Sequence, residues 1–122
     1  MGLVKLEGME FFAYHGFYDE EQTIGNKYNV DLSIHVDLEK PAESDKLSET
    51  INYEILYRVV RSEMEKPSRL LEHIAARICN SIFDEFESVE EISINISKFN
   101  PPLGGICRCA TIVYEQNRAN RH

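Results

Sequence analysis

Alternating apolar and polar residues predict two strands in the first third of the chain. Apolar side chains occupy every second position from residue 28 to residue 38, which is the period of a strand with one buried face. Residues 3–14 alternate in two phases that change at Gly8, and a glycine at such a point indicates a β-bulge. A polar loop at residues 17–26 separates the two strands. We therefore expect a long hairpin.

The middle of the chain has helical spacing instead. One apolar stripe consists of Leu56, Val59, Val60 and Met64, and a second consists of Leu71, Ile74, Ala75, Ile78, Ile82 and Phe86. Asn52 is the expected N-cap of the first helix, and Pro67 ends that helix because proline cannot continue it. Ser68 is the expected N-cap of the second helix. Residues 40–50, which precede both helices, form a polar connection.

Two more strands complete the predicted fold, at residues 91–98 and 107–115. The first alternates Ile92, Ile94 and Ile96 with polar residues, and two prolines and two glycines then end it. The order ββααββ predicts an α+β fold, a four-stranded antiparallel sheet with two helices on one face. We expect a single domain over residues 1–115 and a loose C-terminal tail over residues 116–122.

The exposed surfaces of this sheet predict self-association. Its outer face is polar without strong charge, and nothing in the sequence obviously blocks its two edges from pairing. Pairing edge to edge around a ring would close the sheet into a β-barrel with the polar face inside. We therefore expect a homo-oligomer.

Three ionisable residues stand where a binding site could use them. Lys98 continues the apolar phase of residues 92–96, so its ammonium either returns to solvent at the strand end or lies at the floor of a pocket. Glu72 lies in the first turn of the second helix, where the helix dipole alone could account for a carboxylate, but its small neighbours leave room for a ligand. Glu21 lies in the polar loop, where carboxylates are usually only solvated.

Composition narrows the class of protein. The 122 residues make one domain of ordinary make-up, 43% hydrophobic and 28% charged. The net charge of −8 argues against a nucleic-acid partner, which needs a basic surface. No apolar run is long enough to cross a membrane and the N-terminus has no signal-peptide core, so we expect a cytoplasmic protein. Cys79, Cys107 and Cys109 lack the spacing of a zinc site and are expected to be structural or inert.

Seven groups of short segments together resemble the bacterial dihydroneopterin aldolases, enzymes of folate biosynthesis. In chain order they are GMEFFAYHG at 8–16, EE at 20–21 followed by IG at 24–25, VDL at 30–32, SD at 44–45, TINY at 50–53, LLEHIA at 70–75 and SKFNPP at 97–102. Each segment is weak alone, but their common order and spacing are hard to explain by chance. The resemblance covers residues 3–115.

The resemblance implies the tunnelling fold, in which four subunits close a barrel and two rings stack into an octamer with active sites at the seams between subunits. It implies a pterin substrate, 7,8-dihydroneopterin, cleaved by a retro-aldol reaction to 6-hydroxymethyl-7,8-dihydropterin and glycolaldehyde, with epimerisation of the side chain in many members. Because the ring imine can hold the released electrons as an enamine, the resemblance implies no lysine Schiff base, no metal and no other cofactor.

The resemblance also assigns residues to this reaction. Lys98 matches the lysine that would move protons at the side chain, and Tyr53 matches the tyrosine that would exchange a proton with the enamine carbon. Glu21 matches the loop glutamate that would position the lysine or a bridging water. These three are the expected catalytic residues. The expected substrate-binding residues are Glu72, which would anchor the pterin through paired hydrogen bonds, and Leu71, Ile51, Glu21 and Tyr53.

Related functions stay open as alternatives. After the two prolines the chain has LGGIC at 103–107, where many family members have Pro-Gly followed by His or Phe, so the ratio of cleavage to epimerisation is not fixed. A dihydroneopterin triphosphate epimerase would need more basic residues at its mouth than this acidic chain offers. Zinc-dependent relatives use clustered histidines, and the histidines here show no ligand spacing. A non-catalytic pterin-binding oligomer would need only the Glu72 anchor.

Overall fold

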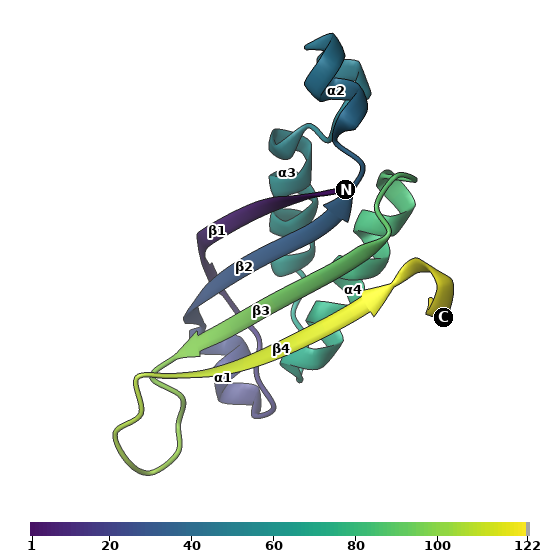
Figure 1. The fold of residues 1–122 in the computed structure, drawn as a ribbon. Helices are drawn as coiled ribbons and strands as arrows, with labels where there is room; N and C mark the ends of the chain where they lie inside the picture. Colours follow the sequence, from purple (N-terminus) through teal and green to yellow (C-terminus); the bar gives the residue numbers. More distant parts are fainter. Residues whose placement is uncertain (122) are drawn as a thin grey trace.

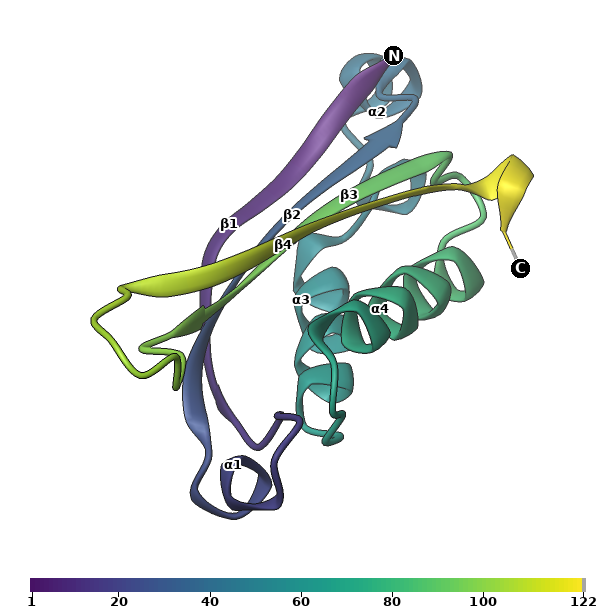
Figure 2. The ribbon, with the colours of Figure 1, turned by 90° about the horizontal axis from the view of Figure 1, so that it is seen from below.

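Four strands form a single antiparallel sheet in the computed structural model, which describes residues 1–121. In spatial order they are β1 (Gly2–Ala13), β2 (Asn26–Val36), β3 (Glu91–Phe99) and β4 (Cys109–Asn117). Helices α3 (Tyr53–Met64) and α4 (Leu71–Glu85) lie side by side on one face of the sheet (Figure 1). Figure 2 shows that the described residues leave the opposite face of the sheet bare. The predicted ββααββ order and α+β class are therefore confirmed.

The core lies between the sheet and the two long helices. Directly opposed pairs on β2 and β3 join Val30 to Ile96, Leu32 to Ile94 and Ile34 to Ile92, and every one of these side chains is buried. The buried helix residues that face them include Leu56, Val60, Ile74, Ile78 and Ile82. Each such side chain contributes about 1.5–3 kcal/mol on leaving water. The alternation of the strands and the stripes of the helices thus form one apolar layer.

Gly8 forms the predicted bulge in β1. The pairing of β1 with β2 shifts register between Leu6 and Met9, and Gly8 has a φ of 71°, a conformation that glycine adopts without steric cost. The Gly8 N–H donates a hydrogen bond of 2.7 Å to Asp31 Oδ1. The bulge therefore leaves no unsatisfied backbone donor at that point.

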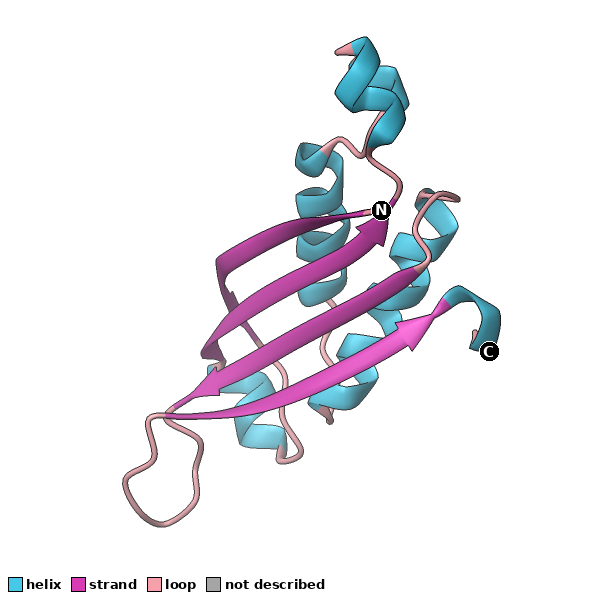
Figure 3. Cartoon of the chain, viewed as in Figure 1, coloured by secondary structure: helices cyan, strands magenta, loops and turns pink. Residues whose placement is uncertain are grey.

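Short helices fill two segments that the sequence predicted as polar connections (Figure 3). The first connection contains α1 (Asp19–Ile24), and the second contains α2 (Glu39–Ser44) and the 3₁₀ helix η1 (Leu47–Glu49). Neither α1 nor α2 has a buried residue, so no apolar stripe marks them in the sequence. No helix within residues 1–121 is long and apolar enough to cross a membrane.

The caps of the two long helices differ from each other. Asn52 caps α3 as predicted, since its Oδ1 accepts a hydrogen bond of 3.0 Å from the Glu54 N–H. The prediction for Ser68 is wrong, because Leu70 is the N-cap residue of α4 and no side chain caps that helix. Ser68 lies instead in the turn before α4, where its polar atoms have other partners.

The end of the chain is tied down over the residues that the structure describes, where the sequence predicted a loose tail. Strand β4 continues to Asn117, and Arg118–Asn120 forms the 3₁₀ helix η2. The Arg118 guanidinium donates hydrogen bonds of 2.7–3.0 Å to the carbonyl oxygens of Phe83, Phe86 and Val89 at and beyond the C-terminal end of α4. A cation there satisfies carbonyls that the helix itself leaves without partners.

Candidate active site

Lys98 lies on the helix-covered face of the sheet, near the C-terminal end of β3. It pairs with Tyr28 on β2 and with Ala110 on β4, and its side chain is only 12% exposed. Its Nζ donates a hydrogen bond to Oε1 of Glu21, whose side chain is 17% exposed. Of the two sequence-based expectations for this lysine, return to solvent is the wrong one. The ammonium is held inside by a carboxylate.

Glu21 reaches Lys98 from α1, which follows the end of β1. Its second oxygen, Oε2, accepts a hydrogen bond of 3.1 Å from the Tyr18 N–H at the start of the helix. Burial raises the pKa of Glu21, but the hydrogen bonds from Lys98 and from the Tyr18 N–H lower it by more, so the pKa lies below its ordinary value of 4.5. The carboxylate is therefore charged at neutral pH and both of its oxygens are fixed in place.

Gly16 makes room for this carboxylate. A Cβ atom on Gly16 would lie 2.7 Å from both the carboxyl carbon and Oε2 of Glu21, and closer still to Glu21 Cβ. The Gln22 side chain donates a hydrogen bond of 3.0 Å to the Gly16 carbonyl, which ties α1 back to the same point. Only a residue without a side chain fits this approach.

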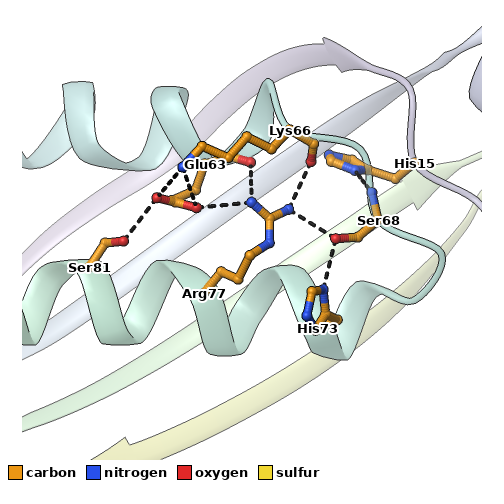
Figure 4. A network of polar contacts seen from close by, with 7 residues as sticks. All are labelled: His15, Glu63, Lys66, Ser68, His73, Arg77 and Ser81. Carbon is orange, nitrogen blue, oxygen red and sulfur yellow. Dashed lines mark hydrogen bonds and ion pairs between the residues drawn. The ribbon is translucent and has the colours of Figure 1, made fainter.

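A partly buried polar network connects His15, just beyond the end of β1, with the α3–α4 turn and α4 (Figure 4). Ser68 is its centre. The Ser68 N–H donates to Nδ1 of His15 at 3.1 Å, and the Ser68 carbonyl accepts from the Gly16 N–H at 2.9 Å. The Ser68 hydroxyl bonds to Nδ1 of His73 at 2.9 Å and accepts from Arg77 at 3.0 Å. The sequence predicted none of these contacts.

His15 is held neutral inside this network. It is 1% exposed, and burial, followed by the nearby Arg77 guanidinium, lowers the pKa of His15 from 6.5 to about 4. Because its Nδ1 accepts a hydrogen bond from the Ser68 N–H, the proton of the neutral ring resides on Nε2. Its carbonyl accepts a hydrogen bond of 2.8 Å from the buried Tyr28 hydroxyl. His15 thus links the Ser68 turn to the strand residue that pairs with Lys98.

Helix α4 begins at the same end of the sheet (Figure 2), and Glu72 belongs to its first turn. Its carboxylate is exposed and makes no hydrogen bond or ion pair with residues 1–121. A surface hollow of about 480 Å³ lies next to it, lined by Gln22, Pro67, Ser68, Arg69, Leu70 and His73. Since no side chain caps α4, the N–H groups of Leu71 and Glu72 are also open to a ligand, whereas those of His73 and Ile74 donate to the Leu70 carbonyl. This end of the helix can accept and donate hydrogen bonds at once.

Ile51 and Tyr53 lie at the opposite end of the sheet. Ile51 lines a hollow together with Val36, the last residue of β2, whereas Lys98 pairs with Tyr28 near the start of that strand. The run of β2 between these two points spans roughly 26 Å at 3.3 Å per residue. Tyr53 begins α3 and is 64% exposed. One chain therefore brings Glu21, Lys98 and Glu72 to one end and leaves Ile51 and Tyr53 at the other.

Comparison with known proteins identifies the family. The family model FolB, dihydroneopterin aldolase, matches residues 4–115. The chain belongs to the dihydroneopterin aldolase family. The dihydroneopterin aldolase of Streptococcus pyogenes serotype M3 is 40% identical over 119 residues, which cover 97% of this chain and 100% of that protein. The dihydroneopterin aldolase of Bacillus subtilis (strain 168) is 39% identical over 106 residues, with 86% of this chain and 88% of that protein covered.

The fold is also that of a dihydroneopterin aldolase. The crystal structure of the E. coli dihydroneopterin aldolase in complex with neopterin matches with a TM-score of 0.88 and 24% identity, covering 96% of this chain and 100% of that chain. The fold that the tunnelling family gives a single chain is therefore confirmed, and so is membership of the aldolase family, whereas the ring assembly stays a prediction. At this identity the structural match concerns the fold alone.

Sequence reasoning missed part of this region of the aldolase fold. It singled out Glu21, Glu72 and Lys98, but it took Ser68 for a helix cap and gave no role to His15 or Arg77. The contacts of Ser68 with His15 join residues 53 positions apart, and no local pattern reports such a contact. The one available signal was His15-Gly16 itself, a polar residue and a glycine placed directly after an apolar strand.

Proposed function

We propose that this chain is a 7,8-dihydroneopterin aldolase of folate biosynthesis that acts in the cytoplasm. It cleaves its substrate to 6-hydroxymethyl-7,8-dihydropterin and glycolaldehyde and also epimerises the side chain. The observation that carries the proposal is the shielded Lys98–Glu21 pair, which lies at the same end of the sheet as the unpartnered carboxylate of Glu72. A proton-transfer group beside a binding carboxylate suits a reaction that moves protons on a bound ring.

Glu72 anchors the pterin ring in this proposal. Its two oxygens can accept hydrogen bonds from the exocyclic amino group of the ring and from the adjacent ring N–H, a paired geometry like that of a guanidinium with a carboxylate. The open N–H groups at the start of α4, near Leu71, offer donors to the ring carbonyl. The ring then lies over the hollow in front of the α3–α4 turn.

The reaction needs a base, an electron sink and an acid. The neutral amine form of Lys98, oriented by Glu21, takes the proton from the hydroxyl on the second side-chain carbon, and the bond between the first and second side-chain carbons breaks to release glycolaldehyde. The electrons of that bond move into the ring imine and give an enamine. Tyr53 then gives a proton to the first side-chain carbon, and the product is 6-hydroxymethyl-7,8-dihydropterin.

Neither a Schiff base nor a metal ion is part of the proposed reaction. Many aldolases need one of them to accept the electrons of the broken bond. The dihydropterin ring carries its own imine, so the substrate supplies the sink. Lys98 is hydrogen-bonded to Glu21, which holds its amino group in place beside the substrate.

The complete site requires two chains. Ile51 lies by Val36, and the run of β2 from Val36 to Tyr28, which pairs with Lys98, spans roughly 26 Å, so Ile51 and the nearby Tyr53 are too far away to meet a substrate bound beside Lys98. We therefore place the active site at the seam between neighbouring subunits, with Tyr53 and Ile51 supplied by the second chain. Pairing of the free edges of β1 and β4 closes four subunits into a homo-oligomeric ring. Two such rings stack into an octamer.

A product assay tests the reaction. Purified protein with 7,8-dihydroneopterin and EDTA is expected to release glycolaldehyde and 6-hydroxymethyl-7,8-dihydropterin, and Lys98→Ala is expected to lower that rate at least ~10²-fold. The matched control is Lys46→Ala, a change at an exposed lysine outside the site. Borohydride added during turnover is expected to leave no adduct on Lys98. Release of the epimer alone, or of neither product, would reject the aldolase function.

A mixing experiment tests the shared site. Lys98→Ala and Tyr53→Phe are each expected to be nearly inactive. When equal amounts are unfolded together and refolded, random assembly gives about a quarter of the seams both an intact Lys98 and an intact Tyr53. Recovery of about a quarter of wild-type activity supports a site made by two chains. No recovery in assembled oligomers would mean that each site is built within one chain.

A further inference from the structure

The segment that carries Glu21 and the turn that precedes Glu72 are fastened together by backbone hydrogen bonds. The Gly16 N–H donates to the Ser68 carbonyl at 2.9 Å, and the Ser68 N–H donates to Nδ1 of His15 at 3.1 Å. A surface contact repeats this tie, since Arg69 donates to the Phe17 carbonyl at 2.6 Å. The backbone of Ser68 therefore moves with the residues that lead into α1 and Glu21.

The side chain of Ser68 is fastened to α4 instead. Arg77 Nη2 donates to Ser68 Oγ at 3.0 Å and to the Lys66 carbonyl at 2.8 Å, so the guanidinium grips the turn at two points (Figure 4). Its other nitrogen, Nη1, donates to Oε1 of the buried Glu63 at 2.9 Å and to the Glu63 carbonyl at 3.1 Å. The rigid fork of an arginine is what allows one side chain to hold both partners.

The Ser68 hydroxyl also contacts the first turn of α4. Arg77 can only donate, so Ser68 Oγ accepts from it, and the same hydroxyl shares a hydrogen bond of 2.9 Å with Nδ1 of His73. His73 follows Glu72 directly in the chain. Ser68 thus connects the Glu21 segment, through its backbone, with the Glu72 turn, through its hydroxyl.

We propose that Ser68 and Arg77 are positioning residues, which set the distance between the Glu72 anchor and the Glu21–Lys98 pair. The inference rests on the proposed function, because it concerns the placement of a pterin between these groups. Arg77 does not line the hollow, and Ser68 lines it with its hydroxyl already bonded to Arg77 and His73. Loss of the Ser68 hydroxyl frees the first turn of α4 but keeps the backbone bonds that hold the Glu21 segment. Substrate binding should therefore suffer while the proton-transfer step is kept.

Ser68→Ala tests this division. We expect KM for 7,8-dihydroneopterin and the dissociation constant of the product 6-hydroxymethyl-7,8-dihydropterin both to rise roughly tenfold, with kcat within about twofold of wild type. The matched control is Ser62→Ala, at an exposed serine of α3, which should leave all three unchanged. If Ser68 had only a structural role, Ser68→Ala would lower the amount of folded protein but would leave kcat and KM of the folded fraction unchanged.

Arg77→Lys provides a second variant if Ser68→Ala fails to fold. The lysine keeps a positive charge beside Glu63, but a single ammonium cannot grip both Glu63 and Ser68, so the same rise in KM and in the product dissociation constant is expected. Unchanged KM and product binding in the variants that fold would overturn the proposal. If the wild type itself neither cleaves the substrate nor binds the product, it is the proposed function that has failed.

Discussion

Gly16→Ala is the sharpest test of the geometry around Lys98. The added Cβ would lie 2.7 Å from the Glu21 carboxyl carbon and Oε2, whereas 3.4 Å is the lower end of ordinary contact. Glu21 would have to retreat by about 0.7 Å or more, and the nearest atom, its own Cβ, is close to the backbone and cannot swing aside. The hydrogen bond from Lys98 to Glu21 would be lost or misaligned.

The expected cost is large for catalysis and moderate for stability. A misplacement of about 1 Å can lower a rate by about 10²-fold, so kcat for 7,8-dihydroneopterin cleavage should fall by a factor of that order. Overpacking of this kind costs about 1–3 kcal/mol of unfolding free energy, which urea titration at a fixed protomer concentration can measure. The matched control is Gly105→Ala, because a Cβ there meets no atom within 4 Å.

A double variant shows whether the effect passes through Glu21. Glu21→Gly removes both the carboxylate and the Cβ that the new methyl group would meet, so adding Gly16→Ala to it should lower kcat no further. Strictly additive losses would mean that Gly16→Ala acts elsewhere. A folded Gly16→Ala protein with kcat within roughly threefold of wild type would refute the reasoning, since the close approach of Gly16 to Glu21 would then be unnecessary.

Three further predictions concern stability. Burial and Arg77 lower the pKa of His15 to about 4, so the unfolded chain binds a proton more tightly than the folded protein does. The free energy of unfolding, which has its full value above pH 6.5, should therefore fall by about 2 kcal/mol between pH 7 and pH 5, and by less in His15→Asn. Equal pH dependence of the two proteins in urea titrations would contradict this. Arg118→Ala should lower the unfolding free energy by about 1–3 kcal/mol, because it removes the hydrogen bonds to the carbonyls at the end of α4. The control Arg58→Ala, at an exposed position, should lower it by less than about 0.5 kcal/mol. Equal losses would mean that Arg118 does not cap the helix. Replacing the ion pair by Lys98→Met with Glu21→Leu should leave the protein inactive but as stable as wild type or up to about 2 kcal/mol more stable, and a loss above about 3 kcal/mol would show that the pair stabilises the fold.

The sequence predicted the sheet and long helices well because their burial is periodic. From Tyr28 to Val36 every second side chain is buried, and the alternation in the sequence reports that directly. Helix α1 escaped prediction because all of its residues are at least partly exposed, so it has no apolar stripe. Its first turn carries three acidic residues, which favour a helix N-terminus but also occur in ordinary loops.

The site could be predicted only as far as single residues depart from such patterns. Lys98 stands in an apolar phase, and that departure is visible in the sequence. The partner that explains it, Glu21, lies 77 positions away and has an ordinary loop context. Ser68 showed the opposite failure, since a serine after a proline fits a helix cap, and the long-range contacts with His15 and Arg77 took its polar atoms instead.

Stability alone does not account for a charged pair at this point of the sheet. An isoleucine at position 98 would continue the series that Ile92, Ile94 and Ile96 begin, and withdrawing two charges from water costs several kcal/mol that their attraction offsets only with good geometry. A sequence that follows its folding rules elsewhere and breaks them at one position marks a functional constraint. The buried hydrogen-bonded Ser68 departs from the same rule beside it, and Tyr53, an exposed aromatic residue, departs from it at the opposite end of the sheet. Under the proposed function these departures belong to one site that forms only when two chains meet, so activity should be a property of the assembly.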